Sequence, residues 1–373
     1  MKYVWYIIIL FLFFLPLPTA ANEQPHELQQ RPHEVLPERE QRGESIVRSI
    51  DQKAECVQSD LTALRERAIQ NNAEAQYELG KMYLEGCAVA KDQAESARWY
   101  KQAAEQGYAP AQNGLAGLYV HGTGVLQNDK EAVKWYRTAA EQGFLPAQAN
   151  LGTMYIFGKP EIRNKEEGLK WLRRAAEQGS AAAQNSIGVM YSNGFGVTQD
   201  KARALEWFRK AAEQGNAIAQ SNLGNLYAEE ESVLRDDAEA FKWIRKAAEQ
   251  GDKTAEFNLG LFYEQGRGTD KNVEEAARWY RRGAEKGFAP GQVNLGALYV
   301  EGQGVEKNDA EALRWFRKAA EQGFDDGQYE LGLAYEEGRG VQQDKAEALK
   351  WLQKAAEQGH SGAQLRLKRL EAR

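Results

Sequence analysis

The chain has 373 residues, of which 42% are hydrophobic and 27% are charged. With 48 basic and 54 acidic residues its formal net charge is −6. This balance argues against nucleic acid as a partner, because proteins that bind phosphate backbones carry an excess of basic residues. Length alone suggests two or three domains, unless the chain is a repeat array, which grows without one large core.

The first 21 residues have the layout of a cleaved signal peptide. Lys2 supplies a positive charge, residues 4–15 form an unbroken apolar run, and small residues precede a cleavage site after Ala21. The apolar run is shorter than the ~20 residues that a membrane-spanning helix needs, although an uncleaved anchor is the alternative. We therefore expect residues 1–21 to be removed, and the mature protein to be periplasmic or secreted without stable membrane insertion.

Residues 22–52 are rich in Gln, Glu, Arg and Pro and contain few apolar residues. Such a segment cannot bury enough surface to offset its ordering entropy. We expect it to be a flexible linker between the signal peptide and the folded part of the chain.

The strongest pattern in the chain is a period of 36 residues. A tyrosine and a glycine recur with this spacing, from Tyr83 to Tyr335 and from Gly107 to Gly359. Tryptophan recurs eight times with the same spacing, at Trp99, Trp135, Trp171, Trp207, Trp243, Trp279, Trp315 and Trp351. A period of this size is typical of a solenoid. We expect the eight tryptophans to be buried, so that Trp207→Ala costs about 3–5 kcal/mol.

Each unit of this period contains the pattern of two helices. In the first unit, Ala75, Leu79 and Tyr83 share one face at helical spacing. Gly80 beside them leaves room for a neighbouring helix. The glycine that ends each AAEQG-like string predicts the end of the second helix. A proline predicts the beginning of the next first helix in three places, at Pro110, Pro146 and Pro290.

An Asp or Asn precedes every second helix, where its side chain can accept hydrogen bonds from the N–H groups of the first turn. These residues are Asp92, Asn128, Asn164, Asp200, Asp236, Asn272, Asn308 and Asp344. A glutamate follows three residues later in seven units, as in a capping box. The basic residue three positions further on predicts an ion pair with that glutamate. In the fourth unit Arg203 and Glu206 exchange these signs, which predicts the same pair reversed.

Both ends of the array differ from its interior. Residues 53–71 match the second half of a unit, with Asn71 in place of the helix-ending glycine; Asn also tolerates the left-handed conformation. Residues 362–373 form a final helix in which Lys368 replaces the packing glycine and Glu371 the tyrosine. We expect polar end caps at 53–71 and 362–373 around eight units in residues 72–361, as an open stack requires.

Residues 295–323 show the full pattern: LGxxY, GxGV, an Asn cap, a Trp followed by an aromatic residue, and AAEQG. This pattern resembles the Sel-1-like repeat (SLR) family, a relative of the tetratricopeptide repeat, over residues 53–372. The resemblance implies an all-α, right-handed superhelical solenoid of about eight 36-residue helix–turn–helix repeats, with the first helices on its concave side. It also implies an adaptor that binds other proteins, often in bacterial envelopes, in secretion or in host contact.

Two units depart from this pattern in the loop between their helices. Residues 158–163 replace the loop of the third unit, and Glu230 and Ser232 replace both glycines in the fifth. We expect reshaped loops at these two places.

No catalytic, metal-binding or cofactor-binding pattern is present in the sequence. The four histidines do not cluster, and the chain contains no HExxH, GxxxxGK[ST] or SxxK string. The GxG strings lie between two helices and not after a strand, so they are turns and not phosphate-binding loops. We therefore expect a protein that is not an enzyme and needs no cofactor. Two alternatives remain: a periplasmic binder of an extended peptide or polysaccharide, and a hydrolase-like activity as claimed for some cysteine-rich SLR relatives.

A row of arginines recurs on the second helices, at Arg137, Arg173, Arg209, Arg245, Arg281 and Arg317. Each is followed by a glutamate four residues later. This spacing favours ion pairs on an exposed, self-neutralised face. A surface that binds a polyanion is the alternative.

The only two cysteines, Cys56 and Cys87, are predicted to form a disulfide. The signal peptide would direct them to an oxidising compartment, and the repeat frame places them on the same edge of adjacent layers. The bond would stabilise the N-terminal cap by about 3–4 kcal/mol. Two free thiols are the alternative.

The candidate partner-binding residues lie on the first helices. An asparagine recurs on one flank of these helices, at Asn150, Asn222, Asn258 and Asn294. A row of side-chain amides can hold an extended backbone of any sequence. Beside them are four apolar residues where an exposed helix would carry polar ones, namely Phe257, Leu261, Tyr329 and Leu333. We expect a partner protein of the envelope, of a secretion system or of a host to bind here, unless these side chains only bond and pack between layers.

Overall fold

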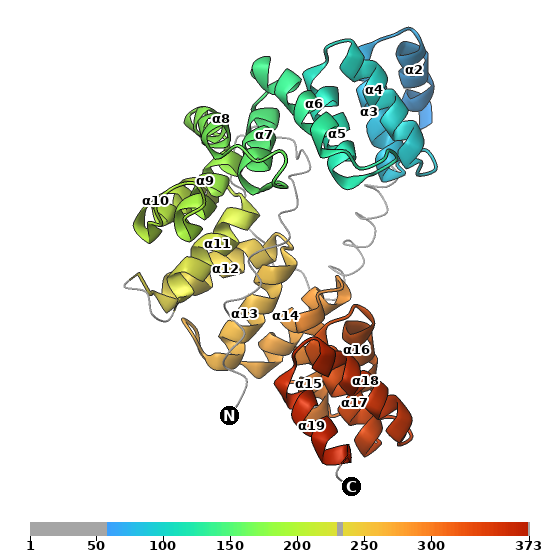
Figure 1. The fold of residues 1–373 in the computed structure, drawn as a ribbon, viewed down its shortest axis with the longest axis vertical. Helices are drawn as coiled ribbons and strands as arrows, with labels where there is room; N and C mark the ends of the chain where they lie inside the picture. Colours follow the sequence, from blue (N-terminus) through green and yellow to red (C-terminus); the bar gives the residue numbers. More distant parts are fainter. Residues whose placement is uncertain (1–57, 230–233, 372–373) are drawn as a thin grey trace, which may run out of the picture. The chain divides into compact units, whose positions relative to one another are not determined.

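The computed structural model describes residues 58–229 and 234–371 of the chain. These residues form 18 helices and no strand (Figure 1). The expected all-α solenoid is therefore confirmed. The expected signal peptide and linker, and the fifth-unit substitutions Glu230 and Ser232, lie outside the described residues.

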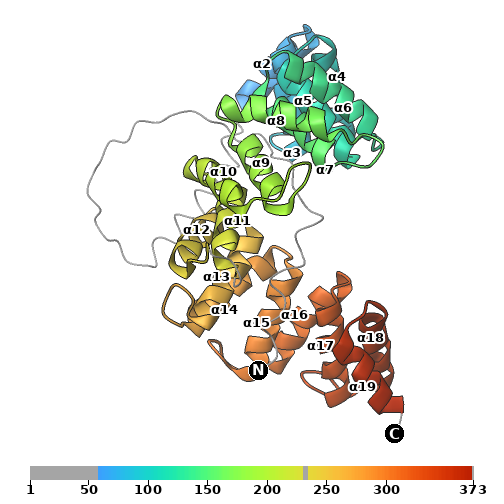
Figure 2. The ribbon, with the colours of Figure 1, turned by 60° about the vertical axis from the view of Figure 1, so that its left-hand side comes forward.

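The helices between the terminal helices α2 (Gln58–Ile69) and α19 (Ser361–Glu371) form eight pairs. The first helices of the pairs are α3 (Ala73–Glu85), α5 (Ala109–His121), α7 (Leu145–Phe157), α9 (Ala181–Asn193), α11 (Ala217–Ala228), α13 (Lys253–Gln265), α15 (Ala289–Glu301) and α17 (Asp325–Glu337). The second helices are α4 (Gln93–Glu105), α6 (Asp129–Glu141), α8 (Lys165–Glu177), α10 (Lys201–Glu213), α12 (Asp237–Glu249), α14 (Val273–Glu285), α16 (Asp309–Glu321) and α18 (Lys345–Glu357). The two helices of a pair pack on each other, as α15 and α16 do in both views (Figures 1 and 2).

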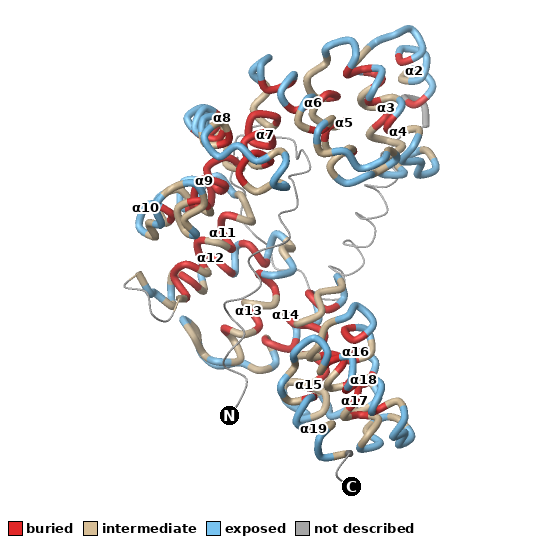
Figure 3. Tube along the Cα trace, viewed as in Figure 1, coloured by how far each residue is buried: buried red, intermediate tan, exposed pale blue. Residues whose placement is uncertain are grey.

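The helices fall into two compact units whose boundary lies within α9. The first unit runs up to Ile187 and includes Phe195–Thr198. The second unit contains Gly188–Gly194 and the chain from Gln199 onward. In each unit the buried residues lie along the helices, and the loops between them are mostly exposed (Figure 3).

The predicted caps begin all eight second helices. Each Asp or Asn has an extended backbone, and its side chain accepts a hydrogen bond from the N–H three residues later. For example, Asp92 Oδ1 lies 2.9 Å from Glu95 N, and Asn272 Oδ1 lies 3.0 Å from Glu275 N. Such a cap satisfies one of the N–H groups that the helix itself leaves without a partner.

The prediction that the glutamate of each capping box accepts a bond from the backbone N–H of the capping residue is wrong. The backbone N–H of each capping residue donates to the carbonyl of the repeated tyrosine, as Asp92 N does to Tyr83 O at 2.9 Å. The glutamate is therefore free to pair with the basic residue three positions later, and Glu275 lies 2.6 Å from Arg278. In the fourth repeat the prediction fails in a different way, because Arg203 pairs with the cap Asp200 at 3.3 Å and not with Glu206.

Left-handed residues end the second helices, as the sequence predicts. Gly107 has a φ of +87°, and Asn71 at the end of the leading half-repeat has a φ of +67°. Asn71 is one of only two non-glycine residues with positive φ in the described chain. The three prolines lie in the first turns of α5, α7 and α15, where a missing N–H costs nothing.

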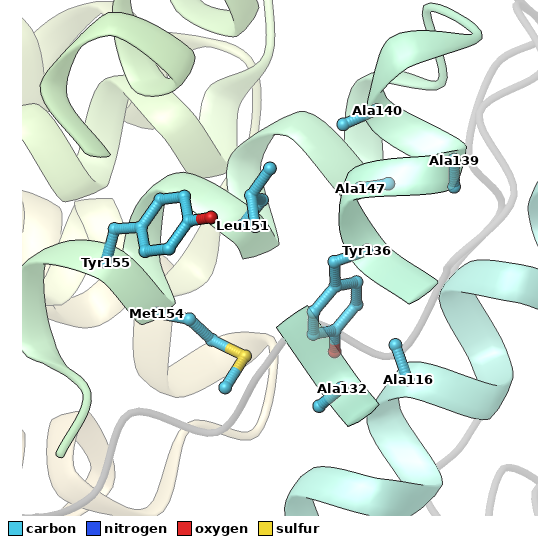
Figure 4. Packing of buried hydrophobic residues seen from close by; sticks show 9 residues of the cluster. All are labelled: Ala116, Ala132, Tyr136, Ala139, Ala140, Ala147, Leu151, Met154 and Tyr155. Carbon is cyan, nitrogen blue, oxygen red and sulfur yellow. The ribbon is translucent and has the colours of Figure 1, made fainter. Parts of the chain in front are cut away.

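The core of each repeat forms where the first helix comes close to its second helix. A glycine of the first helix faces the large residue that follows the tryptophan: a Cβ atom on Gly296 would lie 2.5 Å from the Phe316 ring. Gly80 and Tyr100 show the same approach at 2.5 Å. In the second repeat Ala116 takes the place of the glycine, and Tyr136 fills the core beside it (Figure 4). Glycine or alanine is thus needed here because any larger side chain would separate the two helices.

The expectation that all eight tryptophans are buried is wrong for six of them. Only Trp243, at 6% exposure, and Trp315, at 4%, are buried, while the other six are half-exposed. Most of the indoles carry a cation over the ring, such as Lys318 at 4.1 Å from the Trp315 centroid. The large residue after each tryptophan is buried, and Tyr136, Tyr280 and Phe316 have 1% exposure or less.

The loop of the third repeat is reshaped, as expected. Gly158 has a φ of −69° and a ψ of −179°, whereas the corresponding Gly122 is left-handed. The Arg163 guanidinium donates two hydrogen bonds to Gly158 O, at 3.1 and 2.8 Å. Lys159 pairs with Asp129 of the preceding repeat at 2.7 Å. The loop is therefore stabilised by charged side chains in place of the glycine turn.

Candidate functional site

In six repeats a buried glutamine holds the first helix to the second helices on either side of it. Gln112 donates from Nε2 to Ala104 O at 3.1 Å, at the end of the preceding second helix. Its Oε1 accepts a hydrogen bond from Gln142 at the end of its own second helix, at 2.6 Å. The same pairing joins Gln76 to Gln106, Gln148 to Gln178, Gln220 to Gln250, Gln292 to Gln322 and Gln328 to Gln358. These bonds position the first helices, on which the candidate site lies.

The sixth repeat replaces this glutamine pair by an ion pair. Glu256 takes the buried position with 0% side-chain exposure, and Lys286 takes the other at 2.7 Å from Glu256 Oε1. Arg282 also contacts Oε1, at 3.1 Å. Glu256 Oε2 has no hydrogen-bond partner. It occupies the place from which a glutamine would donate to the carbonyl of the preceding second helix.

Four of the six arginines in the row bind the repeated tyrosine of the following repeat. Arg281 Nη2 donates to Tyr299 OH at 2.7 Å, and Arg317 Nη2 donates to Tyr335 OH at 3.0 Å. Arg137 bonds Tyr155 and Arg209 bonds Tyr227 in the same way. Arg245 alone of the six has the expected pair with a glutamate four residues later, Glu249 at 2.8 Å. The expected self-neutralised face is therefore wrong for four arginines, which join successive repeats.

We predict that Tyr299→Phe lowers the free energy of unfolding by about 1 kcal/mol, because the Arg281 hydrogen bond is lost. Tyr263→Phe is the matched control, since its arginine, Arg245, pairs with Glu249 instead. The control should change stability by less than about 0.5 kcal/mol, the usual range for substitutions away from such bonds. Urea unfolding followed by circular dichroism measures both variants. Equal losses for the two would show that the arginine–tyrosine bond does not join the repeats.

The predicted asparagines bond neighbouring helices. Asn150 is 4% exposed and donates to Asn113 Oδ1 of α5 at 3.0 Å. Asn258 donates to Asn225 Oδ1 of α11 at 2.9 Å. Asn294 hydrogen-bonds the phenol of Tyr280, and Asn222 is half-buried. The geometry thus favours a role for these amides between layers of helices over an open row for a partner.

The predicted apolar residues are all half-buried. The Phe257 ring lies 5.6 Å from Tyr280 and 5.4 Å from Phe288. Leu261 packs against the cluster around Tyr280. Tyr329 stacks on His360 with the ring centroids 4.4 Å apart, while Leu333 has part of its side chain open to solvent. Each therefore contributes to its own repeat and also leaves apolar surface exposed.

Phe257, Leu261 and Asn294 all contact Tyr280 or its cluster. Sequence reasoning missed this tyrosine. Tyr280 OH donates to Glu264 Oε2 at 2.5 Å. Burial, together with the nearby Glu264 carboxylate, raises the pKa of this phenol well above its ordinary value. This ring position holds Tyr100 and Tyr136 in two other repeats and Leu, Ile or Phe in the rest, so the repeat pattern does not show which phenol meets a carboxylate.

The described residues contain no group of three or more His, Cys, Asp or Glu side chains that could hold a metal ion. None of the helices in residues 58–229 and 234–371 is long and apolar enough to cross a membrane. Cys87 lies half-buried in the loop after α3. Its predicted partner Cys56 lies outside the described residues, so the disulfide stays a prediction.

The model of the Sel1 repeat matches the chain eight times in succession, at residues 73–108, 109–144, 145–180, 181–216, 217–252, 253–288, 289–324 and 325–360. The chain belongs to the Sel1 repeat family. Each matched Sel1 repeat contains one first helix and one second helix of the fold. No curated protein matches the sequence.

Two solved structures of Sel1 repeat proteins are similar to this chain. One is c5321, a protective antigen present in uropathogenic Escherichia coli strains, with 40% identity and a TM-score of 0.59 over 83% of this chain and 67% of that one. The other is a Sel1 repeat protein from Oxalobacter formigenes, with 34% identity and a TM-score of 0.59 over 84% of this chain and 91% of that one.

Proposed function

We propose that this Sel1 repeat protein is a non-enzymatic scaffold that binds partner proteins on its first helices. The observation that carries the proposal is the absence of charge from four successive first helices. Neither Asp, Glu, Lys nor Arg occurs in α5, α7, α9 or α11. By contrast, the second helix α6 begins Asp-Lys-Glu and ends with a further glutamate. Depletion of charged residues is what distinguishes the centre of protein-binding surfaces from other protein surface.

These uncharged helices still reach the solvent. In α5, Asn113, Gly117 and Val120 are half-buried, and in α7 Thr153 and Phe157 are half-buried. A helix that is buried on all sides needs no charge, but these residues keep part of their surface open. A partner that covers this surface would bury only uncharged groups, so binding would not require removing charges from water.

We further propose that the protein works in the periplasm or outside the cell. The first 21 residues support this location, because they have the layout of a cleaved signal peptide. The Escherichia coli relative is described as a protective antigen, which also supports a location beyond the cytoplasm. A partner from the envelope, from a secretion system or from a host fits this location.

The test is a single charge placed on the uncharged face. In Gly117→Lys, the new side chain starts in open space, since a Cβ atom there would meet only Tyr136 OH at 3.6 Å. The first repeat carries Lys81 at the corresponding position, so the fold accepts this residue. We expect capture of the partner from an envelope extract to fall at least about tenfold, because a buried unpaired charge costs more than 1.4 kcal/mol.

Thr138→Lys is the matched control for this experiment. It adds the same charge to the exposed face of α6 in the same repeat, at a position where other repeats carry Lys210 or Lys246. Capture should equal that of the wild type, and both variants should keep the wild-type unfolding temperature. Unchanged capture by Gly117→Lys, or a loss confined to Thr138→Lys, would place binding on another surface.

A further inference from the structure

His360 lies between α18 and α19 and makes two side-chain hydrogen bonds. Its Nδ1 accepts from the backbone N–H of Ala363 at 3.0 Å. Its Nε2 lies 3.1 Å from Asp326 Oδ1 of α17. Because a backbone N–H can only donate, Nδ1 carries no proton in this arrangement, and Nε2 carries the proton that it donates to Asp326. The network therefore requires the neutral imidazole.

His360 thus caps α19, as an Asp or Asn caps other first helices. At the corresponding positions, Asn216 accepts from Ala219 N at 2.8 Å and Asp252 accepts from Ala255 N at 2.7 Å. Amide oxygens and carboxylates remain acceptors at neutral pH. Imidazole differs because its ordinary pKa of about 6.5 makes it gain a proton in the mildly acidic range.

We propose that protonation of His360 removes the cap of α19 and loosens the first turn of this helix, while the imidazolium stays bound to α17. The protonated ring has an N–H on both nitrogens. Its Nδ1–H would point at the Ala363 N–H, so two donors would face each other where one hydrogen bond existed. The bond to Asp326 is kept and becomes an ion pair.

The charged groups around the ring favour this retention on α17. Asp326, Asp325 and Glu330 all face it from α17, and the hydrogen bond to Asp326 is the main cause that raises the pKa of His360, against the opposing effect of burial. Burial raises the pKa of Glu330 itself. Tyr329, also of α17, contributes the stacked ring.

In the described part of the chain, no charged group of α18 or α19 is among those that shift the pKa of His360. On α19, Arg366 pairs with Glu336 at 2.7 Å and with Glu337 at 3.7 Å. On α18, Glu357 is exposed and accepts from Gln353 at 3.3 Å. The proton on His360 is therefore stabilised from α17 alone.

The two hydrogen bonds of His360 respond to pH in opposite directions. Since its pKa is raised in the folded chain, the pair with Asp326 adds stability that is fully present below about pH 6.5 and is lost as pH rises through the raised value. The cap of α19 exists only above that value. Protonation of His360 therefore keeps the contact with α17 and acts on the first turn of α19, where the fully buried Ala363 packs near Tyr329.

Hydrogen exchange of the backbone amides of Ala363 and Gln364 tests the proposal on the whole chain at pH 8.0 and 5.0, after correction for intrinsic rates. Loss of an N-cap of typical strength predicts protection about 3- to 30-fold lower at pH 5.0. His360→Asn keeps a capping side chain that does not titrate, so its protection should be equal at both pH values. His360→Phe copies the uncapped aromatic residue of other repeats, so its protection should be low at both. A wild-type ratio within twofold of that of His360→Asn, in a sample whose His360 ring titrates by NMR, would overturn the proposal.

Discussion

Phe208→Ala is expected to lower the free energy of unfolding of the second unit by about 3–5 kcal/mol. The ring is 3% exposed, and it fills the space beside Gly188, where a Cβ atom would lie 2.5 Å from it. Its removal leaves a cavity that the backbone of two tightly packed helices cannot close. The loss therefore combines the transfer energy of the ring with the cost of the cavity.

The neighbouring Trp207→Ala is the matched comparison. It should lower the free energy of unfolding by no more than about half as much, because folding removes less of a half-exposed ring from water. Trp207 is half-exposed, with Lys210 over its ring at 4.6 Å from the centroid. Urea unfolding of both variants, followed by far-ultraviolet circular dichroism, compares them directly. If Trp207→Ala proved the more damaging, the repeated tryptophan would be the main core residue after all.

Arg282→Gln and Lys286→Gln together are expected to destabilise the second unit by about 3–5 kcal/mol, because Glu256 would remain as an uncompensated buried charge. The carboxylate is 0% exposed, and these two residues are its only ion-pair partners in the described chain. Each single substitution should cost less than half of this, because one cation would remain.

Adding Glu256→Gln to that double variant should restore stability to within about 1 kcal/mol of the wild type, because two neutral hydrogen bonds replace the buried charge. The triple variant copies Gln76, Gln102 and Gln106 of the first repeat. Its new side chain can donate to the preceding second helix as Gln292 does to Ala284 O at 3.0 Å. Thermal unfolding of the four variants measures the rescue. A triple variant as unstable as the double variant would show that the charge on Glu256 is not the cause of the loss.

Local features of the fold could be predicted because each depends on a few neighbouring residues. The caps such as Asp92, the left-handed Asn71 and the prolines of the first turns follow from backbone chemistry within one turn of helix. The period of the sequence then fixes their repetition. These features place the first and second helices without any knowledge of their packing.

Features that depend on contacts between helices could not be predicted in the same way. The tryptophan recurs without change, and for this reason it was predicted to be the core residue. The buried position is the next one along the chain, which varies among Tyr, Leu, Phe and Ile. Likewise, Arg281 had a glutamate four residues away on its own helix, but its nearest partner is Tyr299 of the next repeat. Spacing along one helix does not show which of two partners is closer in the fold.

For the candidate site, the sequence predicts residues on the first helices but not the bonds that these residues make within the protein. Asn150 and Asn258 are the same chemical type at the same repeat position, and both turn out to bond other asparagines, Asn113 and Asn225. An amide that is open to a binding partner and an amide that is bonded within the protein are both polar residues on a flank of a helix. No pattern in the sequence distinguishes them.

The arginine–tyrosine bonds and the ion pair of Glu256 differ in which repeats they connect, and this difference bears on how such an array can change in length. Arg281 and Tyr299 belong to successive repeats, but every repeat supplies the tyrosine and six supply the arginine, so a duplicated repeat could join almost any neighbour. Glu256 and Lys286 both lie within residues 253–288, one matched repeat. This buried charge would therefore be copied or deleted together with its partner. Duplication or loss of a whole repeat would leave no unpaired charge, because Glu256 and Lys286 would be copied or lost together. An exchange of one helix between repeats would separate the two residues and leave the charge of Glu256 without its partner.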